Sequence, residues 1–440
     1  MNVLNRNINN IFFIFALSHL IIWTLVPSLT NKNLPLDTIE ALAWGSNLDW
    51  GFNKHPPMSA FFPELFYLIF GPQDWSYYLL SQIFVVITFF VVFKFAEELF
   101  KNTTLSLISV LLLEGIYFYN FTTPEFNVNV CQLPFWALSV YYSWKLFDKQ
   151  KISFKDCFWL GVFASIGFLS KYLFIYLLIA IDLLFFYIIF IKKYKKFDFK
   201  YLISLEVFIF LLVPHLIWLT NNDYVTITYG LARTGLENSS FLDHFVYPLI
   251  FLFKQVGILI PFFIMSFFLI KKLKFRIFLK DKKLLFLIFI NLVPIALMFL
   301  TSLITGSKIR TMWMTPFYLF FGVLFVYLLR SQIDLKKINS FIYGFLFFFL
   351  LSPIIYSYES ISKTNKRTDY PGKDIATKVQ IIWNQDFDKE IEFLTGDEWK
   401  AGNLSYHLKS RPKWEGFTNK EILKDSSQFI CVDDVCLGRY

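Results

Sequence analysis

The sequence predicts an all-α polytopic membrane domain followed by a small α/β domain, and three observations lead to this fold class. The 440 residues are 56% hydrophobic and 17% charged, whereas a soluble domain carries about 25% charged residues. Apolar runs of about 18 residues or more recur along the chain, as in membrane-spanning helices, and they do not alternate as the strands of a β-barrel would. After residue 356 the composition turns polar.

The apolar runs predict about eleven transmembrane helices within a first domain at 1–356. They lie at 11–29, 75–97, 104–121, 128–147, 157–170, 172–191, 203–219, 247–270, 284–304, 312–330 and 340–356. The first run is too long for the apolar core of a signal peptide, and no small-residue cleavage site follows it, so we expect an uncleaved span. Polar residues at 170–172 separate two adjacent runs.

The basic residues predict the orientation of the chain. They lie in short clusters between the apolar runs despite a net charge of +9. Such clusters are typical of charges that set topology and meet anionic lipids, so we expect membrane lipids and no nucleic acid as partners. With a cytoplasmic N-terminus, most Lys and Arg fall inside, in connectors such as 145–155, 192–200 and 271–283. An odd number of spans then places the C-terminal tail outside.

The tail at 357–440 is expected to form an extracytoplasmic α/β domain. A helix-like stretch, "KDIATKVQIIW", precedes the strand-like stretches "IEFLTG" and "SQFICV", and alternating short elements are typical of such a fold. Cys431 and Cys436 are disulfide candidates outside the cytoplasm, with two free thiols as the alternative. Cys131 and Cys157 lie in spans, where core packing explains them.

Charged residues collect in the segments predicted to face outward. The candidates in the first outer loop, 30–74, are Asp37, Glu40, Lys54 and His55. Those in the later outer segments are Glu125, Lys171, Arg233, Lys308 and Arg310. This side of the membrane has no nucleotide-sugar supply, and the chain lacks P-loop and Rossmann glycine patterns. An outward-facing transferase would therefore use an activated lipid donor, such as a polyprenyl-phosphate-linked sugar. The leaving phosphate needs cations, and an attacking hydroxyl needs a carboxylate base.

Five motifs follow one another in the order and spacing of a known superfamily. An acidic residue in the first outer loop precedes "WGSNLDWGFNKHPP", and "TPE", "GFLSKY", "SKIRTMWMTPFY" and "TGDEWKAGNLSYHLKSRP" follow. This set resembles the GT-C fold membrane glycosyltransferases of the glycosyltransferase family 39 type. They are related to dolichyl-phosphate-mannose protein mannosyltransferases and include the lipid A aminoarabinose transferase. The likeness covers nearly the whole chain.

The resemblance implies roles for four residues. Asp37 matches the catalytic acid of the first loop, which deprotonates or orients the acceptor. Glu125 matches a second catalytic acid, although the family usually has Asp at this position. Lys54 matches the lysine that contacts the lipid phosphate, and Lys171 matches the basic residue at the end of its span.

Two arginines are further candidates for binding the donor phosphate. Arg233 is the one basic residue of the loop at 220–247, and Arg310 lies in a later outer segment. A guanidinium can bind a phosphate through two parallel hydrogen bonds. Both residues are therefore expected to help neutralise the leaving group.

Other interpretations of these residues remain open from the sequence. Asp37 and Glu40 have the spacing of a capping box, and Glu125 could cap the fourth span. Glu40 and His55 are expected to support the catalytic groups, and His55 could be a metal ligand or a hydrogen-bonding turn residue. A divalent metal is left open as a cofactor, because no clear ligand set is visible.

The sequence thus predicts a glycosyltransferase in the bacterial cytoplasmic (inner) membrane, working on its outer face. It would move a hexosyl- or pentosyl-type sugar from a polyprenyl phosphate to a glycolipid, glycan or protein acceptor, for example in lipid A or cell-envelope glycosylation. One alternative is a transporter or flippase of lipid-linked sugars that uses the intramembrane acids Asp182 and Glu114. Another is a non-catalytic subunit of an envelope assembly.

Overall fold

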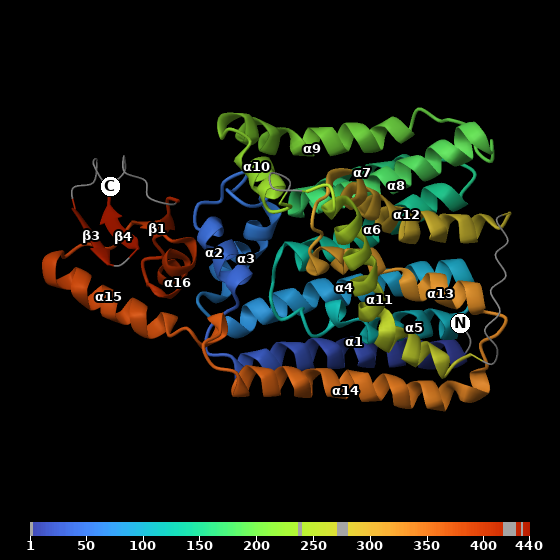
Figure 1. The fold of residues 1–440 in the computed structure, drawn as a ribbon, viewed down its shortest axis with the longest axis horizontal. Coiled ribbons are helices and arrows are strands. Elements are labelled where there is room, and N and C mark those ends of the chain that lie inside the picture. The colour runs from blue at the N-terminus through green and yellow to red at the C-terminus, as the bar shows by residue number, and fades with distance from the viewer. Residues whose placement is uncertain (1–2, 236–239, 271–279, 417–427, 433) are drawn as a thin grey trace.

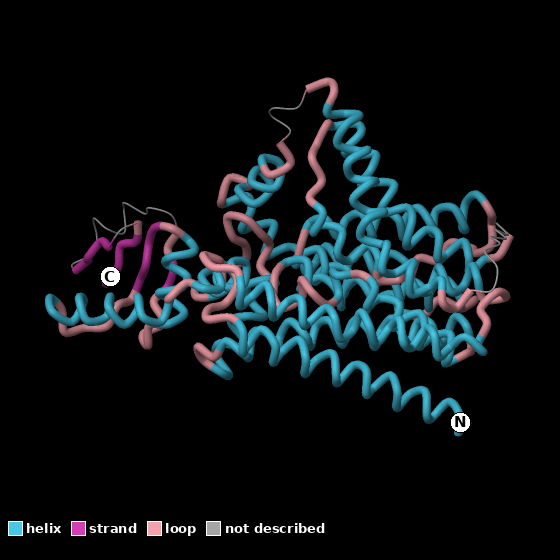
Figure 2. Tube along the Cα trace, turned by 60° about the horizontal axis from the view of Figure 1, so that its bottom comes forward, coloured by secondary structure: helices cyan, strands magenta, loops and turns pink. Residues whose placement is uncertain are grey.

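A computed structural model describes residues 3–235, 240–270, 280–416, 428–432 and 434–440. It is mostly helical, with one small sheet at the C-terminal end of the molecule (Figures 1 and 2). Residues 271–279 of the Lys-rich connector expected at 271–283 lie outside the described residues. The predicted fold class, a helical membrane domain with a small α/β domain, is confirmed.

The long helices run side by side along the long axis of the molecule (Figure 1). The bundle consists of α1 (Val3–Thr30), α4 (Asp74–Phe100), α5 (Thr103–Leu111), α6 (Val128–Asp148), α7 (Phe154–Ser170), α8 (Ile175–Phe186), α9 (Tyr201–Asn221), α11 (Asp243–Phe267), α12 (Lys282–Thr305), α13 (Phe321–Leu329) and α14 (Ile338–Ser362). Short helices between them are α2 (Leu36–Gly45), α3 (Met58–Phe70) and α10 (Val225–Ala232).

Each predicted apolar run forms a helix or a helical pair. Among the described residues, 7 helices are long and apolar enough to cross a membrane. The 3-10 helix Thr311–Tyr318 and α13 form a pair bent by 52°, and if this pair is one span the number is 8. The other three runs form α5 with its 3-10 extension, α6 and α7. The break predicted at 170–172 is present, because α7 ends there and a 3-10 turn, Tyr172–Phe174, precedes α8.

Burial separates inner helices from those on the outside of the bundle. In the apolar stretch of α4, 67% of the residues are buried, against 17% in that of α9. Apolar side chains that no other helix covers are expected to face lipid. The bundle therefore has a central α4 and an outer α9.

The C-terminal part packs on the segment 30–74, mainly on α2 (Figure 1). It contains the helices α15 (Gly372–Asp386) and α16 (Glu398–His407) and one sheet with the strand order β2-β1-β4-β3. The strands are β1 (Phe393–Gly396), β2 (Lys413–Trp414), β3 (Gln428–Val432) and β4 (Val435–Arg439). A disulfide joins Cys431 to Cys436. Helix α16 approaches α2 so closely that a Cβ on Gly402 would lie 3.0 Å from the Ile39 carbonyl oxygen. This contact brings α16 to the candidate site.

Candidate active site

Asp37 and Glu125 meet at the start of α2. The Glu125 Oε1 atom accepts a hydrogen bond from the Asp37 backbone N–H at 3.0 Å. Helix α2 has Pro35 as its N-cap, without a side-chain cap, so Glu125 satisfies one of the N–H groups that a helix start leaves free. The capping-box interpretation of Asp37 is therefore wrong. Glu125 does not cap α6 either, because Asn127 does so.

Burial opposes the charge of both acids, and nearby cations partly offset this at Asp37. Burial and, to a smaller extent, the charge of the neighbouring Asp37 raise the pKa of Glu125 to about 8. Burial also raises the pKa of Asp37, but three nearby cations, Lys54, Lys171 and Arg233, oppose this. Within the described residues, no side chain hydrogen-bonds the Asp37 carboxylate. It is thus available to a substrate hydroxyl.

Lys54 lies between two carboxylates. Its Nζ donates to Glu40 Oε1 at 2.9 Å and pairs with Glu398, the first residue of α16. Burial raises the pKa of Glu40 to about 7, and the charge of Glu398 adds to this. Burial alone would lower the pKa of Lys54, but the charges of Glu398 and Glu40 outweigh it and raise that pKa above its usual value. Lys54 therefore stays charged.

Lys171 is a buried cation in the break after α7. Its Nζ donates to Asn129 Oδ1 and lies 5.5 Å from the centroid of the Trp313 ring. Burial lowers the pKa of Lys171 to about 7, although the charge of Asp37 raises it. Among the described residues it has no carboxylate in contact. An anion that arrives next to Lys171 would therefore favour its charged form.

His55 is neutral in this site. Burial lowers its pKa to about 3, and the charges of Lys171 and Lys54 contribute. Its ring lies 5.7 Å from Trp44 and 6.1 Å from Tyr229, between ring centroids. In the part of the chain that the structure describes, no group of three or more His, Cys, Asp or Glu side chains is arranged to hold a metal ion. We assign no step to a metal.

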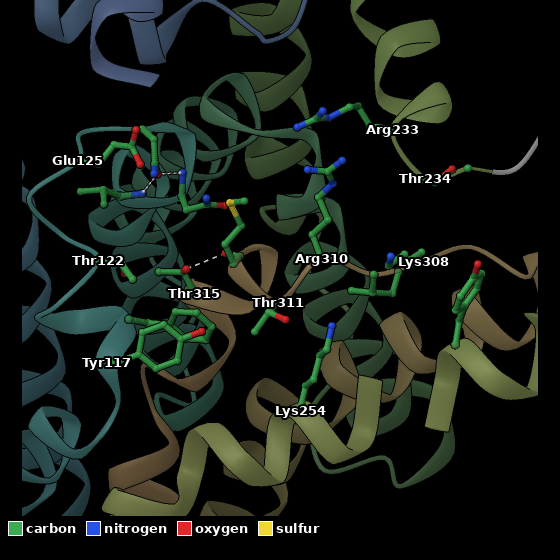
Figure 3. Close-up of a pocket in the computed structure, with 18 of the residues that line it drawn as sticks. Tyr117, Thr122, Glu125, Arg233, Thr234, Lys254, Lys308, Arg310, Thr311 and Thr315 are labelled. Atoms are coloured by element: carbon green, nitrogen blue, oxygen red, sulfur yellow. Dashed lines mark hydrogen bonds between the residues drawn. The ribbon is translucent and has the colours of Figure 1, made fainter. Parts of the chain in front are cut away.

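A cavity of about 900 Å³ adjoins Glu125. Its walls carry four basic side chains, Arg233, Lys254, Lys308 and Arg310. Figure 3 shows Arg233, Arg310 and Lys254 reaching into this space from three different segments. None of the four has an ion-pair partner among the described residues. Such a concentration of unpaired positive charge attracts an anion.

Most of the predicted site residues thus lie at one end of the bundle, beside the C-terminal domain. Sequence reasoning missed Lys254 and Glu398. Lys254 is a lone cation inside the apolar run that forms α11, and this was a usable signal, because intramembrane cations are rarely without a role. Glu398 lies in a motif of the resemblance, but only the fold brings it to Lys54.

The two intramembrane acids are not part of this site. Glu114 is buried and pairs with His19, with 2.7 Å between Oε1 and Nδ1. Its other oxygen accepts from Asn120 Nδ2 at 3.1 Å. Asp182 is exposed on α8. Neither acid lines the cavity.

Comparisons with known proteins agree with this architecture. The family model described as dolichyl-phosphate-mannose-protein mannosyltransferase matches residues 54–218. The structure of ArnT from Cupriavidus metallidurans bound to undecaprenyl phosphate has a TM-score of 0.62 at 12% identity, covering 92% of this chain and 85% of that chain. Its apo state gives 0.63 at 11% identity, covering 97% of each chain. This chain has the GT-C fold.

The fold that the motifs implied by resemblance is therefore confirmed. An oligosaccharyltransferase from Archaeoglobus fulgidus, tethered with an acceptor peptide, has a TM-score of 0.47 at 11% identity, covering 92% of this chain and 64% of that chain. No curated protein sequence matches the chain.

Proposed function

We propose that this chain transfers a sugar from a polyprenyl-phosphate donor to an acceptor on the outer face of the bacterial cytoplasmic membrane. One observation carries the proposal: the unpartnered carboxylate of Asp37 lies within electrostatic reach of three cations. This acid also adjoins, through Glu125, a cavity lined by further cations. The lipid named in the structure of the GT-C relative, undecaprenyl phosphate, supports a lipid phosphate as the anion.

The reaction would be a direct displacement at the anomeric carbon. An acceptor hydroxyl oxygen forms the new bond to that carbon while its proton passes to Asp37. The bond from the anomeric carbon to the phosphate oxygen breaks, and its electron pair leaves with the lipid phosphate. Lys54, Lys171 and Arg233 would neutralise the growing negative charge, which is how enzymes stabilise such leaving groups. Arg310 would assist from the cavity wall.

Glu125 would hold the start of α2 and keep Asp37 in place. Its pKa of about 8 lets it keep a proton near neutral pH, so that two adjacent carboxylates need not both be charged. If the acceptor is itself a phosphate, it is already a nucleophile. In that case Asp37 would orient the acceptor rather than deprotonate it.

The proposal can be tested in membranes by mass spectrometry of glycolipids and glycoproteins. We expect one sugar-bearing species to be absent without the chain and absent again with Asp37→Asn at wild-type expression. A flippase would instead move labelled lipid-linked sugar across vesicles without forming a new glycoside. Asp182 and Glu114 do not line the cavity. They therefore do not form, together with the cavity, a path for a flippase. Retained glycosylation with Asp37→Asn would reject the assigned site.

A further inference from the structure

Lys54 is shared by carboxylates from two distant parts of the chain. Glu40 comes from α2 and Glu398 from the C-terminal domain, and their side chains are only 12% and 2% exposed. An ammonium group has three N–H donors, and these two partners occupy two of them. With both acids ionised, the group of Lys54, Glu40 and Glu398 carries a net charge of −1. A net negative charge is unusual around a lysine that would bind a phosphate.

Glu398 is held firmly in this position. Its Oε1 accepts a hydrogen bond from the Trp44 indole N–H. The preceding residue, Asp397, caps α16 through the Lys400 backbone N–H at 2.9 Å. Gly402 then brings α16 against α2. The carboxylate therefore faces Lys54 as a fixed part of the site rather than as a mobile surface group.

The charge of the lipid phosphate changes during the proposed reaction. The donor is a phosphodiester with one negative charge. The product is a phosphomonoester, which carries a second charge above a pKa of about 6. A fixed carboxylate repels a dianion more strongly than a monoanion at the same distance. The group around Lys54 can therefore distinguish the donor from the spent lipid.

We propose that Glu398 is a specificity residue of the active site: its carboxylate competes with the lipid phosphate for the Lys54 ammonium, which favours the singly charged donor and promotes release of the doubly charged lipid phosphate. The C-terminal domain thereby supplies part of the site. This inference rests on the proposed function, because it takes Lys54 to meet the lipid phosphate.

The first test needs no variant. The purified full-length protein in lipid nanodiscs is titrated at about pH 8, where a phosphomonoester is doubly charged, with undecaprenyl phosphate and with its methyl phosphodiester. We expect the diester to bind at least as tightly as the monoester. A preference of about tenfold or more for undecaprenyl phosphate, as simple charge attraction to cations would give, overturns the inference.

The second test removes the charge of Glu398 but keeps its size. Glu398→Gln should tighten binding of undecaprenyl phosphate by about tenfold and that of the methyl diester by clearly less. The matched control is Glu64→Gln, which breaks another contact of the same domain, the 2.5 Å pair between Glu64 and Arg411. This control should leave the ratio of the two affinities unchanged. An unchanged ratio in Glu398→Gln overturns the inference.

Lys54→Ala separates the inference from the proposed function. If this variant binds undecaprenyl phosphate as well as wild type does, Lys54 does not meet the phosphate and the proposed function fails at this residue. If Lys54→Ala weakens binding but Glu398→Gln leaves the affinity ratio unchanged, only the role of Glu398 is rejected.

Discussion

The two sides of the candidate site differ in how their charges are satisfied. On the side of α2, Lys54 is paired with both Glu40 and Glu398, and Glu125 binds the backbone of Asp37. On the cavity side, Arg233, Lys254, Lys308 and Arg310 have no ion-pair partner among the described residues (Figure 3). The charged groups on the first side have their partners before a substrate arrives. The cations on the second side would gain a partner from an anionic ligand.

This difference suggests a division of labour. Fixed, partnered groups are suited to chemistry, because their orientation costs nothing at the moment of reaction. Unpaired cations on a cavity wall are suited to capture and orientation of an anion. Substitutions on the α2 side should therefore affect the transfer step strongly, and single substitutions on the cavity wall should affect donor affinity more mildly.

Lys54→Ala should have a large effect if the α2 side performs the chemistry. Because neighbouring carboxylates keep Lys54 charged, its loss should reduce the transfer rate in membranes by about 100-fold. Lys151→Ala, on an exposed residue between α6 and α7, is the control and should keep full activity. Equal activity of the two variants would contradict a role for Lys54.

Lys254→Ala and Arg310→Ala test the cavity side. Each should raise the donor KM by about tenfold, as expected for one charged contact among several, with a smaller change in kcat. Saturation curves with a labelled polyprenyl-phosphate sugar give both constants. A fall in kcat as large as that of Lys54→Ala would remove the distinction between the two sides.

The pH profile tests how the two sides act on each other. Activity requires ionised Asp37, whose pKa burial raises, so activity should be lost as the pH falls through a value above the ordinary aspartate range of about 4. Arg233 lowers this pKa. Arg233→Ala should therefore shift the acid limb to higher pH. Arg367→Ala, in the C-terminal part, serves as the control, and a shift to lower pH would refute the electrostatic link.

Arg411→Ala should have the smallest effect on activity and act on stability instead. Arg411 pairs with Glu64, donates to the Leu42 carbonyl at 2.7 Å and lies 4.1 Å from the Tyr67 ring centroid. Its loss should lower the stability of domain docking by about 2 kcal/mol, seen as a lower Tm in detergent. Lys363→Ala, in an exposed pair on α14, should not change Tm. Equal Tm values would mean that Arg411 does not hold the domain.

The helices were predictable because each span is a long apolar run with its own signal. The break around Lys171 was also predictable, since polar residues interrupt an apolar run there. The pairing of Glu398 with Lys54 was not, because 344 residues separate them and only packing of α16 on α2 creates the contact. Local pattern likewise suggested a capping role for Asp37, but the chain places Pro35 at that position.

The most direct test of the account is the transfer activity of Asp37→Asn against Asp49→Asn. Both aspartates lie in the segment 30–74, but Asp49 is exposed and accepts a hydrogen bond from the Trp218 indole at 2.7 Å. In membranes with matched expression, we expect Asp37→Asn to lose about 10²- to 10⁴-fold in sugar transfer, the range for removal of a general base, and Asp49→Asn to remain active. Wild-type transfer by Asp37→Asn would contradict the central claim.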